Sequence, residues 1–292
     1  MSNILIAGCG DVGTALGLEL AADGHAVFAL RRKVSGLPGV FTPVAADLTA
    51  PATLRGLPRV DYLYYTAAAD GRDDAAYERA YVTGLRNILQ ALSVQKPRHV
   101  FYVSSTSVYG QRSGEWVDED SETGPSGFNG ARVLEGEGVL AGGPCAATAV
   151  RFGGIYGPGR TRLIDQVRAG ASCVGEPPVF TNRIHRDDCA GMLRHLLTLN
   201  PPADRYIGVD CDPAAQCAVM EWLAWRLGAP APRRERLDAG SSRGKRCSNA
   251  RLLASGYAFR YPTFREGYSS LIGETAAQAR SSGKTDTDRI GT

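Results

Sequence analysis

The feature that most constrains this chain is a glycine pattern that follows its first apolar segment. Residues 4–13 read Ile-Leu-Ile-Ala-Gly-Cys-Gly-Asp-Val-Gly, so an apolar run leads directly into a Gly-x-Gly-x-x-Gly turn. The pattern predicts a strand over 3–7, a helix over 11–22 and a second strand over 26–30, which together form a βαβ unit. In such a unit the glycines allow a tight turn, close approach of a pyrophosphate, and close helix–strand packing. The free N–H groups at the helix N-terminus favour anions, so the sequence predicts a dinucleotide-binding site.

The residues after the second predicted strand distinguish between the two nicotinamide dinucleotides. Proteins that bind NAD usually place a carboxylate there, which hydrogen-bonds the ribose 2′-hydroxyl. This chain has Arg31-Arg32-Lys33 instead, which offers three cations and no carboxylate. Because a guanidinium group matches a phosphate through two parallel hydrogen bonds, we expect NADP, with NAD the less favoured cofactor. The alternative is that these cations form a solvated basic turn without a ligand.

Strands and helices alternate through the first two thirds of the chain. We expect further strands over 44–46, 60–66, 99–104, 146–152 and 205–209, and helices over 73–95, 129–140, 186–198 and 213–227. This order predicts an α/β Rossmann fold, which is a doubly wound parallel sheet with helices on both faces. Ligands of such sheets bind beyond the carboxyl ends of the strands, so the loops at those ends should form the site.

The pattern also divides the chain into domains. Residues 1–209 are predicted to form the NAD(P)-binding Rossmann domain, and residues 210–272 a small C-terminal subdomain on the substrate side. The irregular segment 153–183 is expected to contribute to the substrate side as well. Residues 273–292 are small and polar and contain no core-forming residues, so we expect a disordered tail.

Composition excludes several classes of protein. The 292 residues are 43% hydrophobic and carry a net charge of only +3, with the cations scattered, so no nucleic-acid surface is predicted. No segment approaches the roughly 18 apolar residues of a membrane span, and the chain enters its first predicted strand too early for a signal peptide. The seven cysteines lack metal-ligand spacing. We interpret them as small buried hydrophobes in a reducing cytoplasm, and we expect no metal site.

Further motifs follow other predicted strands. The block Ser-Ser-Thr-Ser-Val-Tyr-Gly occupies 104–110, Asp47-Leu48 follows an earlier strand, and Tyr-Gly-Pro-Gly-Arg occupies 156–160. In these motifs the chain resembles the extended short-chain dehydrogenase/reductase superfamily, in the style of nucleotide-sugar epimerases and dehydratases, over roughly residues 3–272. The resemblance implies that Asp47 contacts the adenine and that Ser105 hydrogen-bonds a substrate carbonyl or hydroxyl. Alternatively, Ser105 only caps the end of its strand.

The Tyr-x-x-x-Lys pair on which that superfamily relies is missing. The lysine of the pair lowers the pKa of the tyrosine, so that the phenol can transfer a proton near neutral pH. Phe128 and Arg132 stand at the expected positions, and Tyr81 replaces the helical asparagine that supports the tyrosine. Phenylalanine cannot exchange a proton, and arginine does not titrate usefully. The chain therefore resembles the atypical members of the superfamily, which keep the cofactor fold and lose the catalytic residues.

Two functions remain open at this point. The first is an NADP(H)-dependent oxidoreductase, epimerase or dehydratase with a displaced acid/base group. Its catalytic candidates are Ser105, Tyr109 and Tyr156, and Tyr81 and His185 also lie within reach of the strand ends. The second is a non-catalytic NADP(H)-binding redox sensor or regulatory protein. We favour the enzyme, because the chain keeps a substrate-side segment.

The expected ligands follow from the motifs and the resemblance. The partner is a small-molecule substrate, either a sugar nucleotide or a carbonyl compound, and a homodimer through 73–95 and 129–141 is expected by analogy alone. The expected cofactor-binding residues share positions in the glycine turn or at the carboxyl ends of strands. They are Gly8, Cys9, Gly10, Asp11, Val12, Gly13, Arg31, Arg32, Asp47, Leu48, Thr66, Ala67, Ala68, Ser104, Arg132, Gly154 and Ile155.

Overall fold

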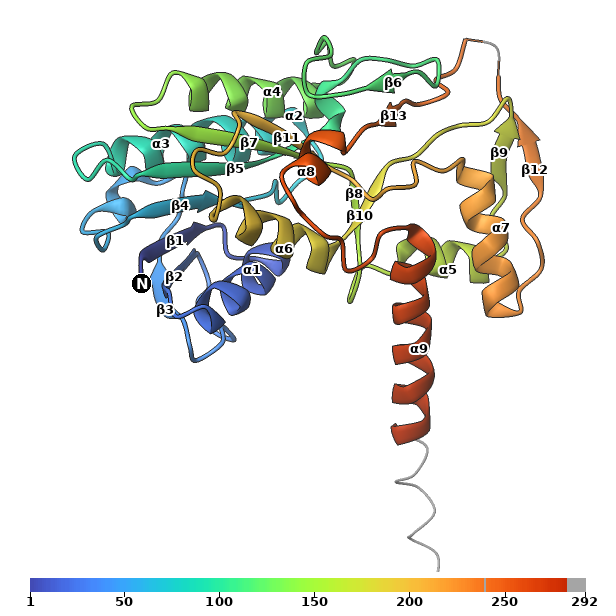
Figure 1. Ribbon diagram of the computed structural model, residues 1–292, viewed down its shortest axis with the longest axis horizontal. Helices are drawn as coiled ribbons and strands as arrows, with labels where there is room; N and C mark the ends of the chain where they lie inside the picture. The colour runs from blue at the N-terminus through green and yellow to red at the C-terminus, as the bar shows by residue number, and fades with distance from the viewer. Residues whose placement is uncertain (239, 283–292) are drawn as a thin grey trace, which may run out of the picture.

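The computed structural model describes residues 1–238 and 240–282, and its main body is built on a seven-stranded sheet (Figure 1). The strand order is β11-β7-β5-β4-β1-β2-β3, and all neighbours are parallel. The bounds are β1 Asn3–Ala7, β2 Ala26–Arg31, β3 Thr42–Ala45, β4 Tyr62–Tyr65, β5 His99–Ser105, β7 Ala147–Phe152 and β11 Arg205–Gly208. The predicted α/β Rossmann fold is confirmed, and its strand order reverses between β1 and β4.

Helices cover both faces of the sheet because β1 is buried on both sides. Ile4 and Ile6 face a core that includes Leu16 of one helix and Met192 of another, whereas Leu5 faces the core on the opposite side. The helices of the first face are α1 Asp11–Ala22 and α6 Arg186–Leu196, and those of the second are α2 Asp74–Glu78, α3 Gly84–Ala91 and α4 Phe128–Ala141. Short 3₁₀ turns occupy Pro51–Leu54 and Thr106–Val108.

The helix expected over 73–95 is interrupted. A π-helical turn, Arg79–Thr83, separates α2 from α3. The buried hydroxyl of Tyr65 donates a hydrogen bond to the Ala80 carbonyl within this turn. Single π-helical turns are rare and often lie at functional sites, and sequence periodicity does not reveal them.

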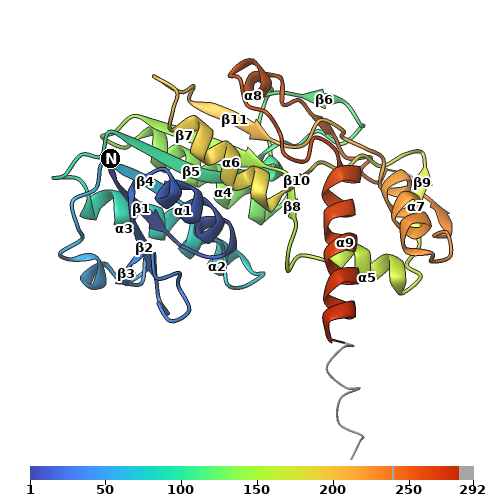
Figure 2. The ribbon, with the colours of Figure 1, turned by 60° about the horizontal axis from the view of Figure 1, so that its bottom comes forward.

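A second, smaller body lies beyond the carboxyl edge of the sheet (Figure 2). Its apolar core includes Ile164, Val219, Leu223 and Phe264. The elements around that core are α5 Arg162–Arg168, β9 Cys173–Glu176, α7 Gln216–Leu227, β12 Arg234–Arg236 and α9 Phe264–Ser282. The two short strands β8 Gly154–Tyr156 and β10 Arg183–His185 pair in parallel and link this body to the sheet.

The chain does not divide cleanly at residue 210. After the small body it returns to the large one, where β13 Arg246–Cys247 pairs with β6 Trp116–Val117. Helix α8 Ala250–Ala254 then buries Leu252 in the core shared with α1 and α6. The segment 210–272 is therefore not one substrate-side unit, since part of it completes the Rossmann body.

Two local expectations are corrected. Cys173 and Cys217 form a disulfide between β9 and α7 and are not free buried thiols; their separation of 44 residues gives no sequence signal. Helix α7 begins at Gln216, three residues later than expected. Helix α9 spans Phe264–Ser282, the disorder expected over 273–292 stays a prediction, and residues 283–292 lie outside the described residues.

Two negative findings hold for the part of the chain that the structure describes. No helix there is long and apolar enough to span a membrane. No cluster of three or more histidine, cysteine or acidic side chains is arranged to hold a metal ion.

Asp210, two residues after the end of β11, is expected to make the protein less stable as pH rises. It is almost fully buried, and burial raises its pKa to about 7. Because its folded pKa is raised above the unfolded value, the folded state binds the extra proton and stability falls between about pH 4 and 7. The loss is at most about 4 kcal/mol. Thermal melts of the wild type and Asp210→Asn from pH 4.5 to 8 measure it. A wild-type curve parallel to that of the variant would contradict this assignment.

Candidate functional site

A cleft of about 620 Å³ lies at the carboxyl edge of the sheet, where the strand order reverses. Its lining joins the glycine turn after β1 to the ends of β2, β4, β5 and β7. The predicted residues that line it are Gly8, Cys9, Gly10, Asp11, Val12, Arg31, Arg32, Asp47, Leu48, Thr66, Ala67, Ala68, Ser104, Ser105 and Ile155. The sequence therefore located most of the cleft without coordinates.

The three motif glycines have different surroundings. Gly8 has a φ of +82°, and an added Cβ would lie 2.4 Å from the Cα of Ala67, so this turn needs glycine. A Cβ on Gly13 would lie 2.8 Å from Oγ1 of Thr66, which fits the expected helix–strand packing and explains why Gly13 does not line the cleft. A Cβ on Gly10 would have no neighbour nearer than the Gly8 carbonyl oxygen, 3.8 Å away. Gly10 therefore presents bare backbone to the cleft.

The end of the cleft beside β2 contains two arginines and two aspartates. Arg31 and Arg32 both line it, and Arg32 forms an exposed ion pair with Asp70 at 3.0 Å. Asp47 accepts hydrogen bonds from the amide and hydroxyl of Thr49, which lower its pKa. Asp47 is therefore an ionised, fixed acceptor at the position where the resemblance expects an adenine contact.

The opposite end of the cleft contains Ser105. Its hydroxyl accepts a hydrogen bond from the amide of Ser107 at 3.1 Å, so it caps the strand end and also lines the cleft. The neighbouring Ser104 is buried and donates to Glu137 at 2.6 Å. The Ser104 hydroxyl thus donates its proton to Glu137, whereas the Ser105 hydroxyl can still donate to a substrate oxygen in the cleft.

The two residues at the positions of the missing pair do not line the cleft. Phe128 is 43% exposed and packs edge-on against Tyr77. Arg132 donates two hydrogen bonds to Asp74, both 2.8 Å long, and another to Glu135. The expected cofactor contact of Arg132 is therefore corrected, because these carboxylates hold its guanidinium on the surface of α4.

The two expected catalytic tyrosines also lie outside the lining. The Tyr109 hydroxyl donates to the Asp118 carbonyl and accepts from buried Arg151, both at 2.8 Å. The Tyr156 ring stacks on Tyr268, and its buried hydroxyl has no hydrogen-bond partner among the described residues. Burial raises both pKa values, that of Tyr109 to about 12. The structure therefore does not bring either expected catalytic phenol to the cleft with Ser105, and Gly154 also lies just outside the lining.

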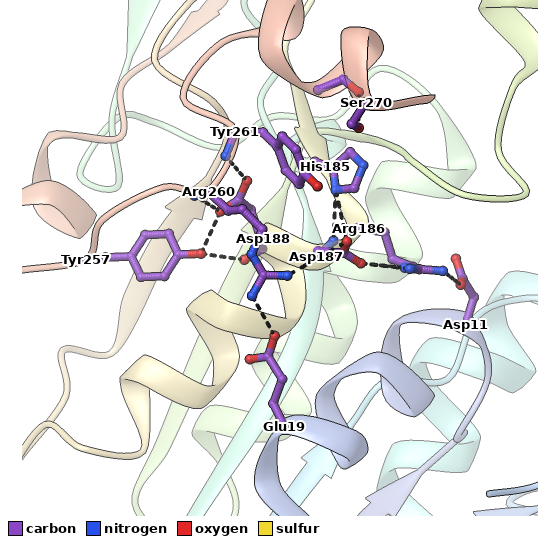
Figure 3. Close-up of polar contacts among 11 residues, drawn as sticks. Asp11, Glu19, His185, Arg186, Asp187, Asp188, Tyr257, Arg260, Tyr261 and Ser270 are labelled. Carbon is purple, nitrogen blue, oxygen red and sulfur yellow. Dashed lines mark hydrogen bonds and ion pairs between the residues drawn. The ribbon is translucent and has the colours of Figure 1, made fainter. Parts of the chain in front are cut away.

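His185 and Asp188 tie the C-terminal segment to the sheet (Figure 3). Asp188 is fully buried and accepts hydrogen bonds from the hydroxyl of Tyr257 and from the amides of Arg260 and Tyr261, at 2.7–2.9 Å. His185 caps α6 by accepting a hydrogen bond from the Asp187 amide. The Asp188 carboxylate is thus fully hydrogen-bonded, the buried Nε2 of His185 has no hydrogen-bond partner among the described residues, and neither side chain lines the cleft.

Sequence reasoning gave little weight to two residues that line the cleft. Tyr81 lies in the π-helical turn, and burial raises its pKa to about 12 against the opposing effect of the Ala69 amide. Arg160 follows the Gly157-Pro158-Gly159 turn and pairs with Asp11 at 2.6 Å. The sequence showed the motif at 156–160, but it did not show that the Arg160 side chain points into the cleft.

A glycine turn at the switch point of a parallel sheet, with a long cleft across the strand ends, defines a dinucleotide-binding Rossmann protein. A family model, "NAD dependent epimerase/dehydratase family", matches residues 4–183. The chain belongs to this family, and the resemblance read from its motifs is thereby confirmed.

Individual relatives agree with this assignment. A Methylobacillus flagellatus structure, named as an NAD-dependent epimerase/dehydratase, is 40% identical with a TM-score of 0.82, covering 94% of this chain and 99% of its own. A Streptomyces 3-diazoavenalumate denitrifying reductase is 28% identical over 79% of this chain and 83% of its own. MoeE5, solved with UDP-glucose and NAD, is 21% identical with a TM-score of 0.79, covering 95% or more of both chains, and shares the fold alone.

Proposed function

We propose that this protein is an NADP(H)-dependent oxidoreductase that reduces a small carbonyl compound. The observation that carries the proposal is the single cleft that joins Arg31 and Arg32 at one end to Ser105 and Tyr81 at the other. The reductase name of the Streptomyces relative supports a reductive reaction. The UDP-glucose bound to MoeE5 keeps a sugar nucleotide as the alternative substrate class.

The residues of the cleft fit a dinucleotide. The amides at the start of α1 and the bare backbone of Gly10 would hold the pyrophosphate, and Arg31 would hold the 2′-phosphate. The bound cofactor supplies the hydride. Ser105 would hydrogen-bond the substrate oxygen, and Tyr81 would donate the proton that this oxygen needs once the carbonyl carbon is reduced. The Tyr81 phenol is protonated at neutral pH and so has a proton to donate, although burial raises its pKa and makes it a weaker acid than the tyrosine of the missing pair.

NADP is expected to bind at least about tenfold more tightly than NAD, because a charge-assisted hydrogen bond contributes about 1.5–3 kcal/mol. The change Arg31→Asp should reverse this preference, since a carboxylate repels the 2′-phosphate and accepts from a 2′-hydroxyl. Isothermal titration with both cofactors measures the preference, with the exposed Arg55→Asp as the control outside the cleft. Equal affinities, or tighter binding of NAD by the wild type, would contradict the NADP assignment.

A second function, a non-catalytic NADP(H)-binding sensor, has one observation in its favour. Neither Phe128 nor Arg132 presents a titrating group to the cleft. Mass spectrometry of ligands that co-purify with the protein separates the two functions, since a bound substrate or product supports the enzyme. The proposal also includes a cytoplasmic location and a homodimer through α2–α3 and α4, which light scattering tests.

A further inference from the structure

The loop after β8 brings a cation to the start of α1. Its turn is closed by a hydrogen bond of 2.9 Å from the Arg160 amide to the Gly157 carbonyl. Gly157 and Gly159 adopt positive φ values of 143° and 75°, which glycine accepts without strain. The turn directs Arg160 across to Asp11, 149 residues earlier in the sequence. A segment outside the glycine motif therefore contributes to the wall of the cleft beside that motif.

Asp11 lies between two guanidinium groups. Its Oδ2 accepts from Nε of Arg160 at 2.6 Å. Its Oδ1 accepts from Nη1 of Arg186 at 3.2 Å (Figure 3). Arg186 also donates two hydrogen bonds to Asp187, whereas Arg160 has no ion-pair partner other than Asp11 among the described residues. Hydrogen bonds within the protein therefore occupy three nitrogens of the Arg186 guanidinium group. Among the described residues, the guanidinium group of Arg160 is hydrogen-bonded through Nε alone.

The geometry leaves the outer nitrogens of Arg160 available in the cleft. Its side chain is 43% exposed, it lines the cleft together with Gly10 and Asp11, and no hydrogen bond to its Nη groups occurs within the described residues. A guanidinium group held at Nε by a carboxylate can still donate both Nη groups to a phosphate. Without this cation, the carboxylate of Asp11 would repel a pyrophosphate bound at the same helix end.

We propose that Arg160 binds the cofactor pyrophosphate on the side opposite the α1 amides, and that Asp11 positions Arg160 for this contact. The inference rests on the proposed function and adds a specific residue to it. It gives the motif at 156–160 a role in holding the cofactor. Arg160 then recognises the pyrophosphate, whereas Arg31 recognises the 2′-phosphate.

Two probes distinguish these contacts, because NADPH contains the pyrophosphate and 2′-AMP does not. Arg160→Gln is expected to weaken NADPH binding about tenfold to 100-fold and to change 2′-AMP binding less than about twofold. Arg31→Asp should weaken both probes. Arg162→Gln, an exposed arginine on α5 outside the cleft lining, is the matched control and should change neither.

The outcomes are separable. Unchanged NADPH binding by Arg160→Gln, with the wild-type melting temperature, would overturn the role of Arg160 and leave the proposed function intact. Equal weakening of NADPH and 2′-AMP would also overturn it, because the arginine would then act on the whole cleft. A wild type that binds no NADPH overturns the proposed function and this inference together.

Discussion

Replacing Gly10 with valine is expected to abolish NADP(H) binding while the protein still folds. The added side chain would extend into the cleft at the point where the backbone is bare, so a pyrophosphate could no longer approach the α1 amides. Folding should persist, because a Cβ at this position meets no atom nearer than 3.8 Å. Titration with NADPH, together with circular dichroism, measures both parts of the prediction.

The matched control for this change is Gly138→Val in α4. An added Cβ there also meets nothing within 4 Å, and the position is exposed and far from the glycine turn in sequence. The control should bind NADPH like the wild type. If Gly10→Val keeps a native spectrum and undiminished affinity, the pyrophosphate site has been misplaced.

The second large effect is expected on turnover. Tyr81→Phe should lower the rate of carbonyl reduction about 10²–10⁴-fold, because proton transfer by a positioned group usually contributes that much. Ser105→Ala should lower the rate as well, while both variants bind NADPH normally. The assay is NADPH oxidation across a panel of small aldehydes, ketones and sugar nucleotides. Ordinary sugar-nucleotide epimerase or dehydratase turnover should be undetectable, since no general base occupies the position of the missing pair.

Tyr109→Phe is the comparison for Tyr81→Phe. It removes a hydroxyl bound to Arg151 inside the protein, so it should lower the melting temperature and leave the rate per folded molecule nearly unchanged. Turnover that survives Tyr81→Phe but is lost in Tyr109→Phe at an unchanged melting temperature would refute our assignment of the acid. Tight NADPH binding with no turnover on any substrate would favour the sensor. The double change Phe128→Tyr with Arg132→Lys should still bind NADPH.

The fold and the cofactor end of the site were predictable because they depend on local patterns. The continuous apolar run of β1, the glycines at 8, 10 and 13, and the cations at 31 and 32 are all local sequence signals. The carboxyl ends of parallel strands meet at one edge, so the strand predictions were enough to bring Thr66, Ser105 and Ile155 together.

The reacting end was less predictable because it depends on the direction of side chains in loops. Tyr156 ends strand β8, as Ser105 ends β5, and Tyr109 lies just after β5. The rings of both tyrosines, however, turn inward toward Arg151 and Tyr268. Long-range packing decides whether a phenol in a loop faces a cleft or a core. The periodicity of the sequence carries no information about this packing. The same holds for Arg160, whose partner is 149 residues away, and for the disulfide of Cys173 with Cys217.

The hydrogen bonds to the Asp188 carboxylate have a consequence for how this protein folds during its synthesis. Its carboxylate is fully buried, and the groups that donate to it come from residues 257–261. During synthesis the seven strands of the sheet emerge first, while this carboxylate has none of those donors, and each missing hydrogen bond to a buried group costs about 1–3 kcal/mol. We therefore expect the last folding step of the Rossmann body to follow the synthesis of residues 257–261.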